Sequence, residues 1–237
     1  MTRAARLARA SSERGDLVLL QRESDGALEL RVNGVYVMDS AETTAERLLA
    51  RAALDAAHWG GRPAPALRVL IGGLGLGFTL DEVLLNPAVT DVVVVEIETD
   101  LVEWHRAGLV PQTSSALRDP RVHIEVRDVV ETVQAQAPTS VDVVLLDVDN
   151  GPANLVYDNN AAIYRLPFLR SCYEATRPGG VTAVWASDAS PDLSAAMSDV
   201  FEAVEQIAVP VTLGARETTY HLFLGRRQGQ ATDNVEA

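Results

Sequence analysis

The sequence predicts an α/β fold: a parallel sheet covered by helices, closed by a C-terminal antiparallel hairpin, with a small N-terminal β-sheet. From residue 67 onward, short apolar runs alternate with helical patterns, which is typical of parallel strands joined by crossover helices. Near the C-terminus, β-rich runs at 207–213 and 219–224 are separated only by a turn, so they must pair antiparallel. Before residue 40, short alternating runs flank Asn33-Gly34, a strong hairpin signal.

The amino-acid composition and net charge disfavour or exclude several classes of function. The 237 residues suffice for one α/β domain and a small appendage, and a net charge of −13 disfavours nucleic acid and anionic membranes as partners. All 20 basic residues are arginine, which excludes lysine Schiff-base chemistry. Cys172 is the only cysteine and the four histidines lack ligand spacing, so we expect no metal. With no apolar run near 18 residues and no secretory signal, we expect a cytoplasmic protein.

The N-terminal part is expected to contain a flexible arm and a small sheet with a helix. We assign residues 1–15 to the arm and 16–62 to the N-terminal domain, whose strands lie within 16–39 and whose helix runs from about 42 to 58. Residues 60–65 read as a linker. A sheet this small cannot stand alone and its edge strands need cover, so we expect a homodimer.

The main domain is expected over residues 63–227, followed by a disordered tail at 228–237. Its predicted strands are 67–71, 91–96, 122–126, 141–146 and 180–186. Its predicted helices are 78–86, 99–107, 129–136, 159–176 and 191–205.

A glycine-rich turn after the first of these strands is the centre of the chemistry. Four glycines fall within residues 72–77, and a helical segment follows, which is the layout of a nucleotide-binding crossover. We therefore assign Gly73, Gly75 and Gly77 to a cofactor, although a tight packing turn is the alternative. Glu96 ends the second strand about twenty residues later, where an acid commonly holds a ribose diol; a structural ion pair is the other interpretation.

Further polar residues follow the later strands at the carboxyl edge, where open α/β sheets bind ligands. Asp128 is either a cofactor contact or a helix cap, and Asp147 follows the fourth strand directly. For each remaining candidate two interpretations stay open: contact with a ligand, or a role in a turn or in core packing. They are Asp149 as a catalytic carboxylate and Asn150, Tyr157, Tyr164, Trp185 and Asp188 as substrate-binding residues.

The order of these segments resembles the spermidine synthase family over residues 16–225. Residues 71–77, Ile-Gly-Gly-Leu-Gly-Leu-Gly, lie where that family has Ile-Gly-Gly-Gly-Asp-Gly-Gly, and 96–98, Glu-Ile-Glu, match its Glu-Ile-Asp. Residues 146–152 fall on its Asp-Ser-Ser-Asp-Pro-x-Gly-Pro loop. The resemblance implies a Rossmann-like class I methyltransferase sheet that binds S-adenosyl-L-methionine (AdoMet), with Glu96 at the ribose and Asp128 beside the adenine.

The chain also departs from the family pattern. Its stretch 41–46 lacks the first acid and the tyrosine of the family's Asp-Glu-x-x-Tyr-x-Glu, and Asn150 replaces the second acid of Asp-x-x-Asp, although Asp149 is adjacent. Gly75 and Ile71 occupy the two positions where loop acids usually bind the cofactor's ammonium. We therefore expect Asp147 to contact the reacting end of the cofactor.

The depleted acids favour a methyltransferase that uses AdoMet and acts on a small-molecule acceptor, with Asp147 or Asp149 taking the acceptor's proton. The first alternative is a polyamine aminopropyltransferase that uses decarboxylated AdoMet. The second alternative is a non-catalytic, cofactor-binding oligomeric scaffold.

Overall fold

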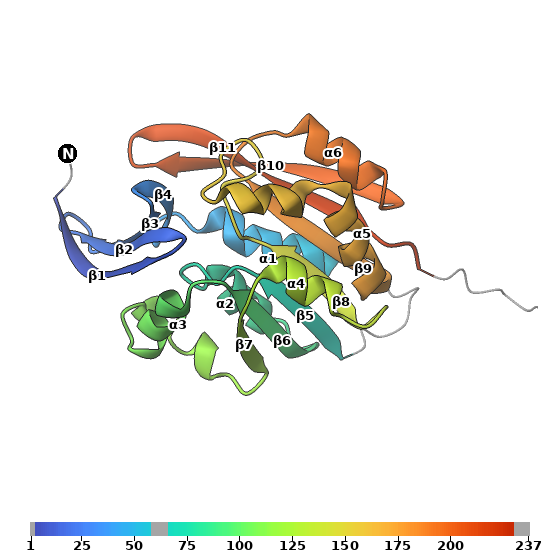
Figure 1. Ribbon diagram of the computed structural model, residues 1–237, viewed down its shortest axis with the longest axis horizontal. Coiled ribbons are helices and arrows are strands. Elements are labelled where there is room, and N and C mark those ends of the chain that lie inside the picture. The colour runs from blue at the N-terminus through green and yellow to red at the C-terminus, as the bar shows by residue number, and fades with distance from the viewer. Residues whose placement is uncertain (1–2, 58–65, 230–237) are drawn as a thin grey trace, which may run out of the picture.

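Two β-sheets of unequal size organise the protein (Figure 1). The computed structural model describes residues 3–57 and 66–229. One sheet has four strands in the order β1-β2-β3-β4, and the other has seven in the order β10-β11-β9-β8-β5-β6-β7. The linker expected at 60–65 and all but the first two residues of the expected tail lie outside the described residues.

The seven-stranded sheet has the predicted topology. Its strands are β5 (Leu67–Gly72), β6 (Val89–Glu96), β7 (Val122–Val126), β8 (Val141–Leu146), β9 (Thr176–Ala186), β10 (Ala203–Leu213) and β11 (Arg216–Arg226). Strands β5 to β9 are parallel, while β11 pairs antiparallel with both β9 and β10, which confirms the Rossmann-like sheet and its terminal hairpin. Because Gly72 of β5 pairs with Leu146 of β8, the glycine-rich turn and Asp147 leave the sheet at the same edge.

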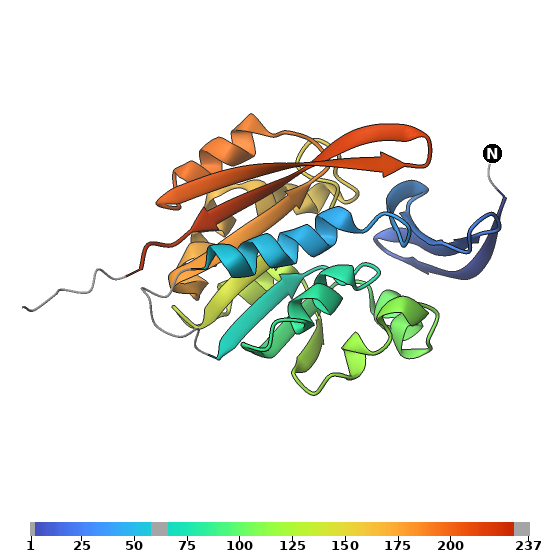
Figure 2. The ribbon, with the colours of Figure 1, turned by 180° about the vertical axis from the view of Figure 1, so that it is seen from behind.

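Helices cover both faces of this sheet (Figure 2). They are α1 (Thr44–Ala56), α2 (Phe78–Leu84), α3 (Thr99–Arg106), α4 (Val129–Gln134), α5 (Leu166–Ala175) and α6 (Pro191–Ser198). Side chains of α1 and α2 share one apolar cluster with the sheet, and those of α4, α5 and α6 share another. The continuous burial of β8 follows from this double cover, because both faces of a parallel strand are then shielded from water.

Helix α1 packs on the central sheet, although we expected it within the N-terminal domain. Its buried residues Ala45, Leu49, Ala50 and Ala53 belong to the same apolar cluster as β5 and β8. The apolar residues of the N-terminal sheet pack instead against α3 and the start of α2. No helix in the described part of the chain is long and apolar enough to cross a membrane.

The N-terminal sheet contains a strand that we did not expect. Its strands are β1 (Ala4–Ser12), β2 (Gly15–Arg22), β3 (Leu28–Val32) and β4 (Val35–Asp39). The flexible arm predicted at 1–15 is therefore wrong for residues 4–12, which pair antiparallel with β2. Alternating alanines and arginines gave no strong apolar period, because most of this edge strand is exposed.

Two predicted helices end earlier than expected. The helix predicted at 159–176 is interrupted at Arg165, which is extended, so that the 3-10 helix η3 (Asp158–Tyr164) precedes α5. Pro167 explains the break, since it has no N–H to donate to the carbonyl of Ile163 and its ring would clash with that carbonyl in a continuous helix. The helix predicted at 191–205 stops at Ser198 because β10 begins at Ala203 and pairs along its whole length with β11.

Candidate active site

A deep cavity lies between the carboxyl edge of the central sheet and the N-terminal sheet. It holds about 950 Å³, including the space at its open mouth. Leu17, Leu30 and Met38 from the N-terminal sheet form one wall. Residues at or after the ends of β5 to β9, such as Gly73 and Glu96, form most of the rest, together with Glu46 of α1 and Leu101 of α3. The N-terminal sheet therefore completes the site, and its apolar residues pack against α3 and the start of α2.

Glu96 is fixed at the floor of the cavity beside the glycine-rich turn. Its Oε2 accepts a hydrogen bond from the backbone N–H of Leu74 at 2.8 Å, and its Oε1 accepts one from Glu98 at 2.8 Å. Burial raises the pKa of this carboxyl, while the two backbone donors oppose the shift. Each oxygen keeps a further lone pair, so the carboxylate can accept two hydroxyl donors such as those of a ribose.

The turn itself brings backbone close to the strand beside it. Gly73 has φ +90°, and a Cβ there would overlap the carbonyl oxygen of Asp147. A Cβ at Gly75 would meet the sulfur of Met38. These two glycines line the cavity, so a ligand can approach the main chain there.

Asp147 lies where β8 ends and its carboxylate is directed to the helix after the glycine turn. Its Oδ2 accepts a 2.7 Å hydrogen bond from the hydroxyl of Thr79 in α2. Burial raises the pKa of Asp147, and the Thr79 hydrogen bond partly offsets this effect. The expected proximity of Asp147 to the glycine turn is present in the structure, while its contact with a cofactor stays a prediction.

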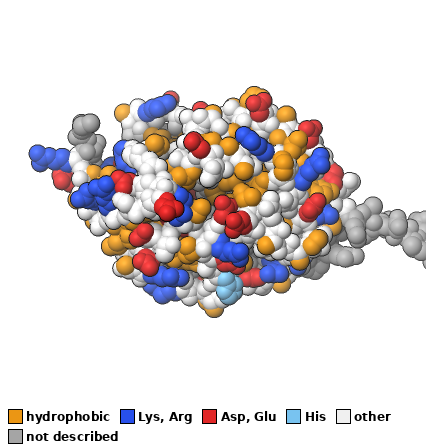
Figure 3. Space-filling view, in the orientation of Figure 1, with side chains coloured by type: hydrophobic (Ala, Val, Ile, Leu, Met, Phe, Trp, Pro, Cys, Tyr) orange, Lys and Arg blue, Asp and Glu red, His pale blue; other side chains and the backbone are white. Residues whose placement is uncertain are grey.

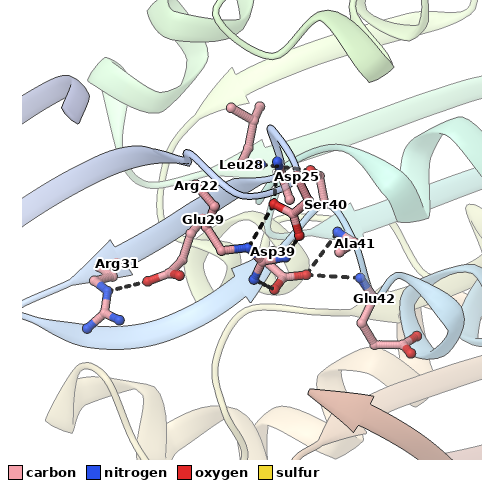
Figure 4. Close-up of polar contacts among 10 residues, drawn as sticks. Arg22, Asp25, Leu28, Glu29, Arg31, Asp39, Ser40, Ala41 and Glu42 are labelled. Atoms are coloured by element: carbon pink, nitrogen blue, oxygen red, sulfur yellow. Dashed lines mark hydrogen bonds and ion pairs between the residues drawn. The ribbon is translucent and has the colours of Figure 1, made fainter. Parts of the chain in front are cut away.

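Glu46 is a cavity residue that the sequence analysis missed. It lies in the first turn of α1 with 6% of its surface exposed, and it lines the cavity. Burial and then the negative charge of Asp147 raise its pKa. Its position depends on Asp39, which accepts hydrogen bonds from the backbone N–H groups of Ala41 and Glu42, both at 2.9 Å (Figure 4).

The same figure shows how Asp39 is held in turn by the N-terminal sheet. Arg22 of β2 forms a 2.6 Å ion pair with Asp39, and both side chains are largely buried. The turn from β4 into α1 is thereby fixed. The sequence analysis compared residues 41–46 with the family pattern for the acid and the tyrosine that they lack. It assigned no role to Glu46, the carboxylate that ends this stretch.

Asp149 organises the loop that follows β8. Its Oδ1 accepts hydrogen bonds from the backbone N–H groups of Asn150 and Val156, both at 2.7 Å, and its Oδ2 accepts one from Asn160 at 2.7 Å. These donors occupy both oxygens of a carboxylate that is only 5% exposed. Asp149 therefore shapes the cavity wall, and its predicted catalytic role has no support from this arrangement.

A second group that the sequence analysis missed connects the N-terminal sheet to the cavity. Arg14, between β1 and β2, donates to Glu98 at 2.7 Å and to the carbonyl of Ile97 at 2.9 Å. Tyr157 also donates to Glu98, at 3.1 Å. Glu98 and Tyr157 line the cavity, so this ion pair ties the sheet to its rim. Arg14 had been assigned to the flexible arm, which concealed this contact.

Three predicted site residues lie away from the cavity. A Cβ at Gly77 would meet the side chains of Thr113 and His105, so glycine at this position allows close packing. Tyr164 is 7% exposed within the apolar cluster of α4 and α5, because η3 turns its ring inward. Asp188 is exposed in a shallow hollow beyond β9 and accepts hydrogen bonds from Asn154 and Ser187.

The other predicted residues do line the cavity. Asp128 also caps α4, since its Oδ1 accepts a 2.7 Å hydrogen bond from Val130. Asn150 donates to the carbonyl of Tyr36 at 3.2 Å, and Trp185 packs against Tyr220 with ring centroids 4.7 Å apart. Their predicted roles in binding stay predictions.

The cavity is strongly acidic. Its described lining contains one basic residue, Arg127, and six acids, namely Glu46, Glu96, Glu98, Asp128, Asp147 and Asp149. Such a lining favours a cationic ligand and a reaction in which a proton is accepted. Within residues 3–57 and 66–229, no group of three histidine, cysteine or acidic side chains is arranged to hold a metal ion.

Comparison with known proteins identifies relatives of this chain. Residues 55–213 match the spermine/spermidine synthase domain. Polyamine aminopropyltransferase 2 of Pseudomonas aeruginosa is 38% identical over 120 residues, which are 49% of this chain and 32% of that protein. Putrescine N-methyltransferase 4 of Nicotiana tabacum is 32% identical over 129 residues, which are 54% of this chain and 31% of that protein. The matched stretch thus spans about a third of these relatives.

Solved structures show the same fold. Spermidine synthase from Thermotoga maritima superimposes with a TM-score of 0.76 at 21% identity, covering 93% of this chain and 72% of that one. A spermidine synthase in complex with the transition-state analogue AdoDATO gives a TM-score of 0.75 at 20% identity, covering 93% and 71% of the two chains.

Proposed function

Since the chain belongs to the spermine/spermidine synthase family, we propose that it transfers an aminopropyl group from decarboxylated AdoMet to a small amine. The observation that carries the proposal is the acidic lining around the glycine turn. Glu46 and Asp147 are buried there, and Arg127, the one basic residue of the described lining, follows β7 at another part of the wall.

The charge of the donor discriminates between the two candidate reactions. AdoMet carries a carboxylate beside the α-ammonium of its methionine end, and in the described lining no basic residue other than Arg127 offsets the repulsion of that carboxylate by Glu46 and Asp147. Decarboxylated AdoMet has no such group, and its sulfonium and terminal ammonium are both attracted by acids. The lack of acids at Ile71 and Gly75 is then offset by Asp147, which lies against the glycine turn.

The residues fit the donor in other respects. Glu96 keeps free lone pairs for two hydroxyl groups, Gly73 and Gly75 leave the main chain open, and Asp128 stands at the neighbouring strand end. The donor supplies an activated carbon on a sulfonium. The protein has to align an amine with that carbon, exclude water and accept one proton.

Sequence reasoning placed methyl transfer first because residues 41–46 lack an acid and a tyrosine of the family pattern. The aminopropyltransferase relatives and the acidic cavity favour the order proposed here. Methyl transfer from AdoMet to an amine is the second candidate, because putrescine N-methyltransferases are also among the relatives.

Calorimetry with the two donors tests the proposal. We expect decarboxylated AdoMet to bind at least about tenfold more tightly than AdoMet, a difference of roughly 1.4 kcal/mol. Equal binding, or tighter binding of AdoMet, would favour methyl transfer. Binding of neither donor would contradict both candidate reactions.

A further inference from the structure

One buried carboxylate at the cavity has no partner among the other described residues. Glu46 lines the cavity with 6% of its surface exposed, and only its own backbone N–H stabilises its carboxylate. A buried, unpaired carboxylate is costly, so such groups are usually hydrogen-bonded or functional. Glu46 lines the same cavity as Asp147 and is close enough to it for the negative charge of Asp147 to raise the pKa of Glu46.

The two acids at this place have different surroundings. Asp147 accepts the hydroxyl of Thr79 at 2.7 Å, which stabilises its ionised form. Thr79 also lies 3.5 Å from the backbone carbonyl of Glu46, so α1 and the end of β8 meet at this threonine. Of the two carboxylates, Glu46 therefore has less stabilisation of its charge and is the stronger base.

We propose that Glu46 is the catalytic base of the reaction, an inference that rests on the proposed amine acceptor. The acceptor nitrogen loses a proton to Glu46 and forms a bond to the carbon next to sulfur. The carbon–sulfur bond breaks, and its electron pair stays on sulfur as a neutral thioether. Asp147 remains with Thr79 and balances the positive charge of the donor. In this chain Glu46 would perform the proton transfer without the tyrosine that residues 41–46 lack.

Other groups near Glu46 must be considered in a pH experiment. Asp39 of β4 and Glu42 precede it, and Asp147 faces it from β8; all three negative charges raise its pKa. Tyr36 of β4 and Tyr220 of β11 are also close enough for their pKa values to be raised by Glu46. Each tyrosine is mainly shifted by burial and stays protonated at neutral pH, so the carboxylates dominate the response between pH 5 and 8.

The test compares Glu46→Gln with Glu42→Gln, a change of the same kind four residues earlier, outside the cavity lining. Wild type and variants are assayed for product with decarboxylated AdoMet and a panel of amines from pH 5 to 9. We expect Glu46→Gln to lower kcat at least about a hundredfold and to remove the acidic limb of the pH profile. Donor affinity measured by calorimetry should change less than about threefold, and Glu46→Asp should restore part of the rate. Glu42→Gln should keep the wild-type kcat and the acidic limb, which moves only to slightly lower pH because one negative charge near Glu46 is removed.

The outcomes separate the two proposals. If the wild type is active and the Glu46→Gln variant is equally active, the role of Glu46 is overturned while the proposed function stands. The role of Glu46 is also overturned if the acidic limb of the pH profile is lost in Asp147→Asn but kept in Glu46→Gln. A wild type that binds decarboxylated AdoMet but converts no amine overturns the proposed function and the inference with it. Because glutamine removes an unpaired buried charge without changing shape, thermal unfolding should show Glu46→Gln to be at least as stable as wild type.

Discussion

Glu46, Glu96 and Asp147 all line the cavity, and their hydrogen-bond partners differ. Glu96 accepts two backbone N–H groups, Asp147 accepts one hydroxyl, and Glu46 receives no hydrogen bond from any other described residue. The number of donors determines how firmly each carboxylate stays ionised and in place. Glu96 is thus suited to fixed recognition of hydroxyl groups, while Glu46 is suited to exchange a proton.

The first prediction at the residue scale concerns Glu96. Its replacement by alanine removes up to two hydrogen bonds to a charged acceptor, each worth about 1.5–3 kcal/mol. Donor affinity measured by calorimetry should fall at least about tenfold. Glu103→Ala, an exposed change on α3, is the matched control and should bind as wild type. Unchanged donor binding by Glu96→Ala would remove this residue from the site.

The second prediction concerns the pH dependence of folding. Because the pKa of Glu46 is raised in the folded protein, its contribution to stability is complete below its unfolded value near 4.5 and is lost as the pH rises through the raised value. The Glu46→Gln variant has no carboxyl group at this position, so it does not lose stability in this way as the pH rises. Urea unfolding should show that the variant gains stability over wild type by about 1 kcal/mol or more between pH 5 and 8. A pH-independent difference would mean that Glu46 titrates normally.

At the scale of elements, the glycine turn and the N-terminal sheet are the parts that shape the site. The turn is packed against the backbone at the end of β8, and the sheet is tied to the rim through Arg14. Each can be tested by a substitution that has a close counterpart elsewhere in the chain.

Gly73 and Gly108 form a matched pair for the turn. Both have positive φ, but a Cβ at Gly73 would overlap Asp147 while one at Gly108 meets nothing within 4 Å. Gly108→Ala should cost about 1 kcal/mol through backbone strain alone. Gly73→Ala should cost at least about 3 kcal/mol because the turn must also move. Equal costs in urea unfolding would show that close packing at the turn contributes little.

Arg14 tests the attachment of the N-terminal sheet. Arg14→Ala leaves the buried Glu98 without its cation, so the sheet should open more often and donor affinity should fall about three- to tenfold. Hydrogen exchange should increase in β1 and β2. Arg9→Ala is the control, because Arg9 pairs with the exposed Asp16 inside the same sheet. Identical exchange in the two variants would contradict a tether through Arg14.

The sequence predicted elements better than it predicted contacts between them. Apolar runs and the short spacing at 214–217 determined the sheet, and the strand order placed Asp147 beside the glycine turn. Tyr164 was predicted at the substrate site but lies in an apolar cluster, because a tyrosine at a cavity and one in the core have the same local pattern. Glu46 and Arg14 were missed because their importance depends on residues far away in the chain.

Over the whole molecule, charge is distributed unevenly. The chain carries a net charge of −13, yet exposed Arg3, Arg6 and Arg9 lie on and before β1, and Figure 3 shows blue side chains gathered at that end. The acids that matter for chemistry are gathered in the cavity behind this sheet. The edge strand β1 is paired on one side only, with β2, among the described residues.

This edge leads to a prediction about assembly. An unpaired edge with the exposed side chain of Leu7 needs cover, so we propose a homodimer formed through the N-terminal sheets. Light scattering at micromolar concentration should give twice the chain mass of 25.5 kDa. A monomer at that concentration would contradict the proposal, and Leu7→Arg should weaken a dimer that uses this edge.

The central claim is that the acidic cavity selects decarboxylated AdoMet for aminopropyl transfer to an amine. Mass spectrometry of products tests it most directly, with each donor incubated separately with putrescine and longer or shorter amines. The account predicts methylthioadenosine and an aminopropylated amine from decarboxylated AdoMet, with no methylated amine from AdoMet. A methylated amine together with S-adenosylhomocysteine, and no aminopropylated product, would contradict it.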